Sequence, residues 1–174
     1  MTVMQRPRLY LLVGYPGAGK TTVAKIIHDH SGAVHLWADK ERREMFKIPT
    51  HKPSESRQLY NHLNKETAKL LSEGKSVIFD TNFNFRKDRD HLRQIAKDND
   101  AEATVVWVNT PKEIAKQRAV HDRQLRNGYE FVLPESEFDR MSRNLQPPKP
   151  DETYEAFDGT DLDPNDVITR LGLK

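Results

Sequence analysis

The 174-residue chain contains no cysteine and no long hydrophobic run. Without cysteine it can form neither a disulfide nor a thiolate zinc site. Its N-terminus has no apolar signal-peptide core, and no stretch of 18 apolar residues follows. A formal net charge of only +2 permits contact with a phosphate-rich ligand but lacks the strong basic bias of a dedicated nucleic-acid binder. These absences predict a soluble, cytoplasmic protein with no membrane anchor.

The most informative positive feature is a glycine-rich motif near the N-terminus. Residues 14–21, GYPGAGKT, fit the phosphate-loop pattern G-x-x-x-x-G-K-[ST]. An apolar run at 8–13 predicts a buried strand before the loop, and residues 21–30 predict a helix after it. The loop amides and the helix N-terminus favour phosphate, and the lysine and hydroxyl suit the β/γ-phosphates and Mg²⁺. The predicted nucleotide-binding residues are Gly14, Pro16, Gly17, Ala18, Gly19, Lys20, Thr21 and Thr22.

Short apolar runs alternate with polar, helix-like segments along the chain. Strands are predicted at residues 9–13, 33–37, 77–79 and 104–108, with a weaker one at 154–157. Strands that alternate with helices predict a parallel sheet covered on both faces. We therefore expect one α/β domain over residues 1–174, a P-loop NTPase (nucleoside-kinase-like) three-layer fold with a five-stranded sheet.

Two later helices have boundary signals. Residues 110–113 resemble a capping box with proline at the first helical position, and the helix is expected to run to Asn127-Gly128. A second helix is predicted after Pro134, from residue 135 to 145, and the proline-rich residues 147–150 should form an extended connector.

Three arginines on the first of these helices form a candidate lid: Arg118, Arg123 and Arg126. Arginines on a lid can stabilise charge on a transferring phosphoryl group. The alternative is a solvated helix face, which an i,i+4 pair between Asp122 and Arg126 would support. Which of the three acts is left open, and Arg118 is also a candidate for binding the nucleotide.

Acidic residues follow the second and third predicted strands. Asp39 could accept the proton of a substrate hydroxyl, and Arg42, one helical turn on, could hold an anion on the acceptor. The alternatives are a helix cap for Asp39 and a solvated side chain for Arg42. Asp80 ends an apolar strand, a position that suits Mg²⁺ support, although it could instead orient the acceptor or end the strand in an Asx turn with Asn82.

These motifs, in this order, resemble the 5′-hydroxyl polynucleotide kinase domain and the broader zeta-toxin-like group of small P-loop kinases, AAA_33. The segments that carry the resemblance are 14–21, Asp39 to Arg42, the DTNFN run at 80–84, and Arg123 and Arg126 before 132–134. The resemblance implies that Lys20 and Thr21 bind phosphate and metal, that Asp39 is the general base and that Arg42 touches an acceptor phosphate. It also implies a lid role for Arg126, or for Arg123 if the register is shifted, and an essential acid at Asp80.

The expected function is ATP- and Mg²⁺-dependent transfer of the γ-phosphate to a hydroxyl, most simply the 5′-hydroxyl of RNA or DNA. The acceptor pocket is expected between Asp39, Arg42 and residues 80–85, where Phe83 or Phe85 could offer a flat surface to a base or instead anchor the core. A kinase acting on a small phosphorylated acceptor, a nucleotide-sugar, a nucleoside or an antibiotic remains an alternative. A non-catalytic ATP switch is a third hypothesis, but a switch has no need of Asp39.

Overall fold

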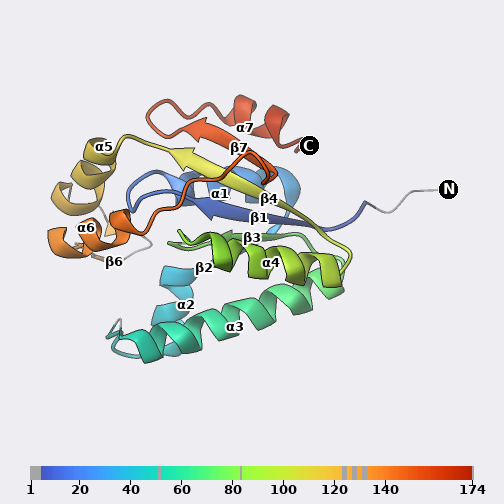
Figure 1. Cartoon of the computed structure of the whole chain (residues 1–174), viewed down its shortest axis with the longest axis horizontal. Coiled ribbons are helices and arrows are strands. Elements are labelled where there is room, and N and C mark those ends of the chain that lie inside the picture. The colour runs from blue at the N-terminus through green and yellow to red at the C-terminus, as the bar shows by residue number, and fades with distance from the viewer. Residues whose placement is uncertain are drawn as a thin grey trace.

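A computed structural model describes residues 5–50, 52–82, 84–122, 125–126, 129–130 and 133–173 (Figure 1). Its centre is a five-stranded sheet in the order β2-β3-β1-β4-β7, with every neighbouring pair parallel. The strands are β1 (Arg8–Val13), β2 (Val34–Trp37), β3 (Val77–Asp80), β4 (Glu102–Asn109) and β7 (Tyr154–Asp158). The predicted α/β class and all five strands are confirmed, the weak last one included.

Alternate residues of the central strand point to opposite faces of the sheet, and a different core covers each face. Leu9 and Leu11 of β1 belong to a core with α3 (Pro53–Ser72) and α4 (Arg86–Asp98), which α2 (Ala38–Met45) joins. Tyr10 and Leu12 belong to the core on the other face, with α1 (Lys20–Ser31) and α7 (Pro164–Arg170). β1 is therefore apolar on both sides, as its uninterrupted hydrophobic run predicts.

A third, smaller cluster lies beyond the carboxyl ends of the strands, toward which the strand arrows of Figure 1 point. It packs α5 (Lys112–Lys116) and a π-helical turn η1 (Gln117–His121) against α6 (Glu135–Arg143). Between η1 and α6, the two-residue strands β5 (Leu125–Arg126) and β6 (Tyr129–Glu130) pair antiparallel. None of the described helices is long and apolar enough to cross a membrane.

The long helix predicted from residue 110 to Asn127-Gly128 is wrong. The helical segment ends at His121. The backbone of the next residue, Asp122, is extended, and Arg126 lies on β5. The Asn127-Gly128 pair, which lies outside the described residues, is a helix-end signal in one context and the strongest short hairpin signal in another. Because the helical segment ends before Arg126, Asp122 and Arg126 are not one helical turn apart, as the alternative of an i,i+4 pair requires.

The predicted capping box is also wrong. Pro111 stands at the N-cap position of α5, which has no side-chain cap. The Thr110 hydroxyl instead donates a hydrogen bond to the Ala18 carbonyl, 92 residues earlier in the chain. The helix predicted after Pro134 is confirmed as α6, although it ends at Arg143.

A buried ion pair fixes α4 to the segment that leads into β7. Nε and Nη2 of Arg89 donate hydrogen bonds to the two Glu152 carboxylate oxygens at 2.8 and 3.0 Å. The side chains of both residues are fully buried. Burial raises the pKa of Glu152, but hydrogen bonds from Arg89, the Lys149 backbone and Arg93 outweigh burial and bring this pKa to about 2. The pair thus holds the connector after α6 in place.

We expect Glu152→Gln to lower the free energy of unfolding by about 3 kcal/mol at neutral pH, since it leaves Arg89 buried without its counterion. The folded-state pKa of about 2 lies below the ordinary 4.5, so the stabilisation is complete above pH 4.5 and is lost as the pH falls toward 2. Denaturant unfolding at a series of pH values should show the two proteins converging over that window. Asp90→Asn, at an exposed partner of Arg93, should cost less than about 1 kcal/mol. A Glu152→Gln effect that is equally small, or that does not change with pH, would contradict the assignment.

Candidate active site

The phosphate loop joins β1 to α1 in a conformation that requires glycine. Gly17 and Gly19 have φ values of 82° and 110°, in the left-handed region that side chains disfavour. A Cβ on Gly17 would lie 2.3 Å from the Ala115 carbonyl oxygen, so the loop also passes too close to α5 for any side chain. The loop and the start of the helix at Lys20 are as the motif predicts.

The ends of β4 and β7 hold this loop in place. The Thr110 hydroxyl donates to the Ala18 carbonyl at 2.7 Å, and Nη1 of Arg118 donates to the Gly159 carbonyl at 3.1 Å. The same Nη1 approaches the Gly17 carbonyl at 3.4 Å. A Cβ on Gly159 would lie 1.8 Å from Thr110 Oγ1 and 2.3 Å from the Ala18 oxygen. The segments that follow β4 and β7 therefore pack so closely against the phosphate loop that a side chain at residue 159 would clash.

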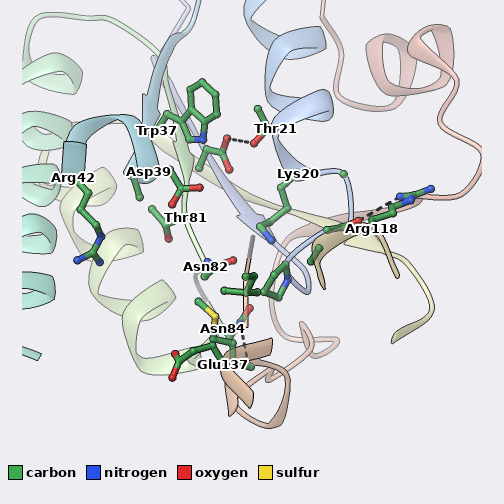
Figure 2. A pocket seen from close by; sticks show the side chains of 18 of the residues that line it. Lys20, Thr21, Trp37, Asp39, Arg42, Thr81, Asn82, Asn84, Arg118 and Glu137 are labelled. Atoms are coloured by element: carbon green, nitrogen blue, oxygen red, sulfur yellow. Dashed lines mark hydrogen bonds between the residues drawn. The ribbon is translucent and has the colours of Figure 1, made fainter. Parts of the chain in front are cut away.

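Lys20, the predicted phosphate-binding lysine, folds back over the phosphate loop and contacts its backbone. Nζ of Lys20 donates to the carbonyls of Gly14 and Tyr15 at 3.0 and 2.9 Å. The side chain is nearly buried yet lines the cavity above the loop (Figure 2). An ammonium group in this position concentrates positive charge where the loop amides converge.

A hydroxyl and a carboxylate meet beside the loop. Thr21 Oγ1 donates to Asp80 Oδ2 at 3.1 Å, although the two residues come from α1 and β3 (Figure 2). Hard oxygen donors of this kind suit Mg²⁺, which binds few protein ligands when it also binds phosphates. Within the described part of the chain, no group of three His, Cys, Asp or Glu side chains could hold a metal ion. A metal at this site would therefore depend on Thr21, Asp80 and phosphate oxygens.

His35 is a member of this site that the sequence did not indicate. Its Nε2 lies 2.8 Å from Asp80 Oδ2, and because the carboxylate can only accept, the ring nitrogen donates. The ring stacks on Trp37 at 5.5 Å between centroids. His35 comes from β2, whose register with β3 cannot be read from an apolar run of this length.

Asp39 lies in the first turn of α2, at the carboxyl edge of the sheet. The N-cap of α2 is Trp37, with no side-chain cap, so the helix-cap alternative for Asp39 is wrong. Asp39 is exposed and lines the same cavity as Lys20 and Asp80. The elements thus bring the two predicted acids and the loop lysine to one cavity.

Arg42 lines this cavity too, but its guanidinium is already engaged. Nη1 donates to Glu55 Oε1 at 2.5 Å and Nη2 to Ser56 Oγ at 3.1 Å. Glu55, from the first turn of α3, is buried and is a second residue that the sequence did not indicate. In Figure 2 Arg42 lies on the side of Asp39 remote from Lys20.

The cavity has a volume of about 1500 Å³, which exceeds the usual size of a pocket for one small ligand. Arg118, Gly159 and Leu162 line it near the loop, and Asn82, Asn84 and Phe85 also line it, with Asn84 beside Glu137 of α6 (Figure 2). Phe83 and Arg123 lie outside the described residues, and only the backbone of Arg126 is described. The roles predicted for these three residues therefore stay predictions.

A phosphate loop on a parallel sheet, with an acid from the neighbouring strand beside its hydroxyl, defines a P-loop nucleotide-binding domain of the kinase type. Residues 9–148 match the AAA_33 family, described as an AAA domain. The chain belongs to this family, which confirms the group that the motifs indicated. No curated protein sequence matches it significantly.

Solved structures of several kinases share the fold. A sugar kinase from Janibacter sp. HTCC2649, unliganded, is 22% identical with a TM-score of 0.68 over 95% of this chain and 92% of that one. The Mycobacterium tuberculosis APS kinase CysC, in complex with AMPPNP and APS, is 15% identical with a TM-score of 0.66 over 95% of each. A chain of the Pnkp1/Rnl/Hen1 RNA repair complex is 23% identical with a TM-score of 0.67, over 82% of this chain but only 45% of that one. At these identities the likeness shows the fold alone.

The contact between Gly159 and the phosphate loop leads to a prediction. Gly159→Ala should weaken ATP binding at least tenfold, because the added methyl group must displace the Ala18 carbonyl or Thr110. Gly74→Ala is a control for a glycine substitution without steric contact: an added Cβ meets no atom there, and the strain at its φ of 79° acts on stability rather than on the phosphate loop. Titration with a fluorescent ATP analogue would measure both. Equal affinities for the two variants would show that the Gly159 contact does not shape the loop.

Proposed function

We propose that this protein is an ATP- and Mg²⁺-dependent kinase that transfers the γ-phosphoryl group to a hydroxyl of a second substrate. The observation that carries the proposal is the single cavity that Lys20, the Thr21–Asp80 pair and Asp39 all line. A nucleotide-binding protein without a transfer reaction needs the first three residues but has no use for a carboxylate facing them.

The nucleotide would occupy the half of the cavity next to the loop. The loop amides and Lys20 would bind its β- and γ-phosphates. Arg118 and Leu162, which line the cavity beside Gly159, would flank its base. Thr21 and Asp80 are the residues that would hold Mg²⁺, which when bound neutralises charge on the phosphates.

The acceptor would bind between Asp39 and the Asp80–Phe85 segment. Asp39 would accept the proton of the attacking hydroxyl, whose oxygen forms a bond to the γ-phosphorus. The bond between that phosphorus and the β–γ bridging oxygen breaks, and ADP leaves with the bridging oxygen. The products are a phosphomonoester and ADP, and no further reactant is needed.

Two classes of acceptor are open within this proposal. The Asp39-to-Arg42 and 80–84 motifs favour a 5′-hydroxyl of RNA or DNA, and the RNA repair complex has a chain of similar fold. Sugar and APS kinases of similar fold favour a small molecule. The ion pair that occupies Arg42 supports the second class, because the pair has no net charge with which to bind an acceptor phosphate.

Asp39→Asn should lower turnover by about 10² or more, the usual effect of losing a general base, while ATP affinity stays within about twofold. Glu44→Gln is the matched control, because Glu44 lies on the same helix but pairs with Lys40 away from the cavity. Steady-state kinetics and ATP titration on both variants would test this. Unchanged turnover in Asp39→Asn would leave nucleotide binding without the proposed chemistry.

The Thr21–Asp80 pair gives a prediction about metal binding. Thr21→Val keeps the shape of the side chain but removes the hydroxyl, so the Mg²⁺ concentration needed for tight ATP binding should rise about tenfold or more. Thr21→Ser, which keeps the hydroxyl, should behave like the wild type. The measurement is ATP affinity by fluorescence as a function of Mg²⁺, which does not depend on turnover. If Thr21→Val has the wild-type Mg²⁺ requirement, the metal lies elsewhere.

A further inference from the structure

The Arg42–Glu55 pair is the most deeply buried charged contact on the acceptor side of the cavity. The side chains are only 11% and 7% exposed, and Nη1 of Arg42 lies 2.5 Å from Glu55 Oε1. The other carboxylate oxygen of Glu55 accepts from the Thr50 backbone and hydroxyl at 2.7 and 2.8 Å. Glu55 is thus held from two directions and cannot easily release Arg42, since an unpaired buried carboxylate is costly.

Charge is divided unequally along the cavity. Near the phosphate loop, the described lining cations Lys20, Lys25 and Arg118 suit a triphosphate. On the acceptor side, Arg42 is matched by Glu55, and Arg140, which also lines the cavity, is matched by Glu137 at 2.7 Å. Asp39 adds a negative charge there. The described acceptor side therefore has no excess of positive charge with which to bind a phosphate.

Polar groups that are short of partners line the same side. Thr81 and Asn84 are only 4% and 3% exposed, and both line the cavity. Among the described residues, Thr81 Oγ1 and Asn84 Oδ1 have no partner of ordinary hydrogen-bond geometry, although the Thr81 hydroxyl lies close enough to the Tyr60 phenol to offset part of the rise that burial causes in the pKa of that group. Nδ2 of Asn84 donates a long hydrogen bond of 3.4 Å to the Met141 carbonyl. Buried polar groups without partners are rare in native proteins, so Thr81 and Asn84 are candidates to turn toward a ligand in the cavity that they line.

Neutral hydroxyl groups complete this side of the cavity. Burial raises the pKa of Tyr60, and the proximity of Thr81 and Arg42 offsets only part of that rise, so the phenol stays protonated. Ser56 and Thr50 also line the cavity. Hydroxyl and amide groups of this kind donate to and accept from the hydroxyls of a substrate.

On the basis of the proposed kinase function, we propose that the acceptor is a small, uncharged, hydroxyl-rich molecule, such as a sugar, a polyol or a nucleoside. Thr81 and Asn84 contact its hydroxyls. Glu55 is the specificity-determining residue: by pairing with Arg42 it removes the one buried cation of the described acceptor side that could bind a phosphate. A polynucleotide, which carries a phosphate next to its terminal nucleoside, is disfavoured by the same contact.

The test compares acceptors that differ by one phosphate. The wild-type protein would be assayed with MgATP and pentoses and hexoses against their monophosphates, nucleosides against their 3′-monophosphates, and a 5′-hydroxyl oligonucleotide. We expect transfer to at least one uncharged acceptor, with kcat/KM at least tenfold above that of its phosphorylated counterpart. Preference for the phosphorylated member, or for the oligonucleotide, overturns this inference and leaves the kinase function standing. Absence of transfer to every acceptor overturns both.

Variants then assign the preference to Glu55. Glu55→Gln should release Arg42 and raise kcat/KM for the phosphorylated acceptor relative to its uncharged partner by about tenfold or more, the usual effect of one charge-assisted hydrogen bond. Misfolding cannot produce such a gain. Glu73→Gln, an exposed change at the end of the same helix that removes the pairing with Lys75, should leave the ratio unchanged.

A double variant keeps the test valid if Glu55→Gln does not fold. Arg42→Gln with Glu55→Gln removes both charges together, so no ion is left buried alone. Its acceptor ratio should remain as in the wild type, because no cation is released. A double variant that gains the phosphorylated acceptor, or a folded Glu55→Gln with an unchanged ratio, would show that the ion pair does not set the specificity.

Discussion

The close contact of the phosphate loop with Thr110 and Gly159 is the constraint on which the site depends. The loop can lie where it does only because residue 159 has no side chain and because Thr110 donates its hydroxyl to the loop rather than to its own helix. This contact joins the carboxyl ends of β1, β4 and β7. Arg118 lies against carbonyls of the same loops, so residues predicted to bind the nucleotide come together from three parts of the chain.

The two ends of the cavity differ in charge, and this difference supports the proposed phosphoryl transfer. A cationic loop at one end suits a triphosphate, while Asp39 faces it from α2. The other end is balanced by the buried Arg42–Glu55 pair. Contacts of this kind can set the acceptor without altering the phosphate loop, because they lie on the helices beyond the sheet edge.

Much of this arrangement could be predicted from the sequence, since the loop motif and the five apolar runs act locally. Asp80 could also be picked out as a candidate for Mg²⁺ support because it ends an apolar strand, although its contact with Thr21 is seen only in the structure. The partners Glu55 and His35 could not be predicted, because an ion pair across two helices and a strand register depend on tertiary packing. The prediction of a helix that reaches residue 128 was wrong for a different reason, because an Asn-Gly pair occurs both at helix ends and in hairpins. The capping box was wrong because the Thr110 hydroxyl bonds to the Ala18 carbonyl instead of to its own helix.

The most direct test of the kinase assignment is a crystal structure with Mg²⁺ and a non-hydrolysable ATP analogue. The account predicts that the triphosphate lies along residues 14–21 with the metal at Thr21 and Asp80. Its γ-phosphate should face Asp39 across the cavity, with room for an acceptor between them. A nucleotide bound with its γ-phosphate turned away from Asp39, or with that space closed, would contradict the account.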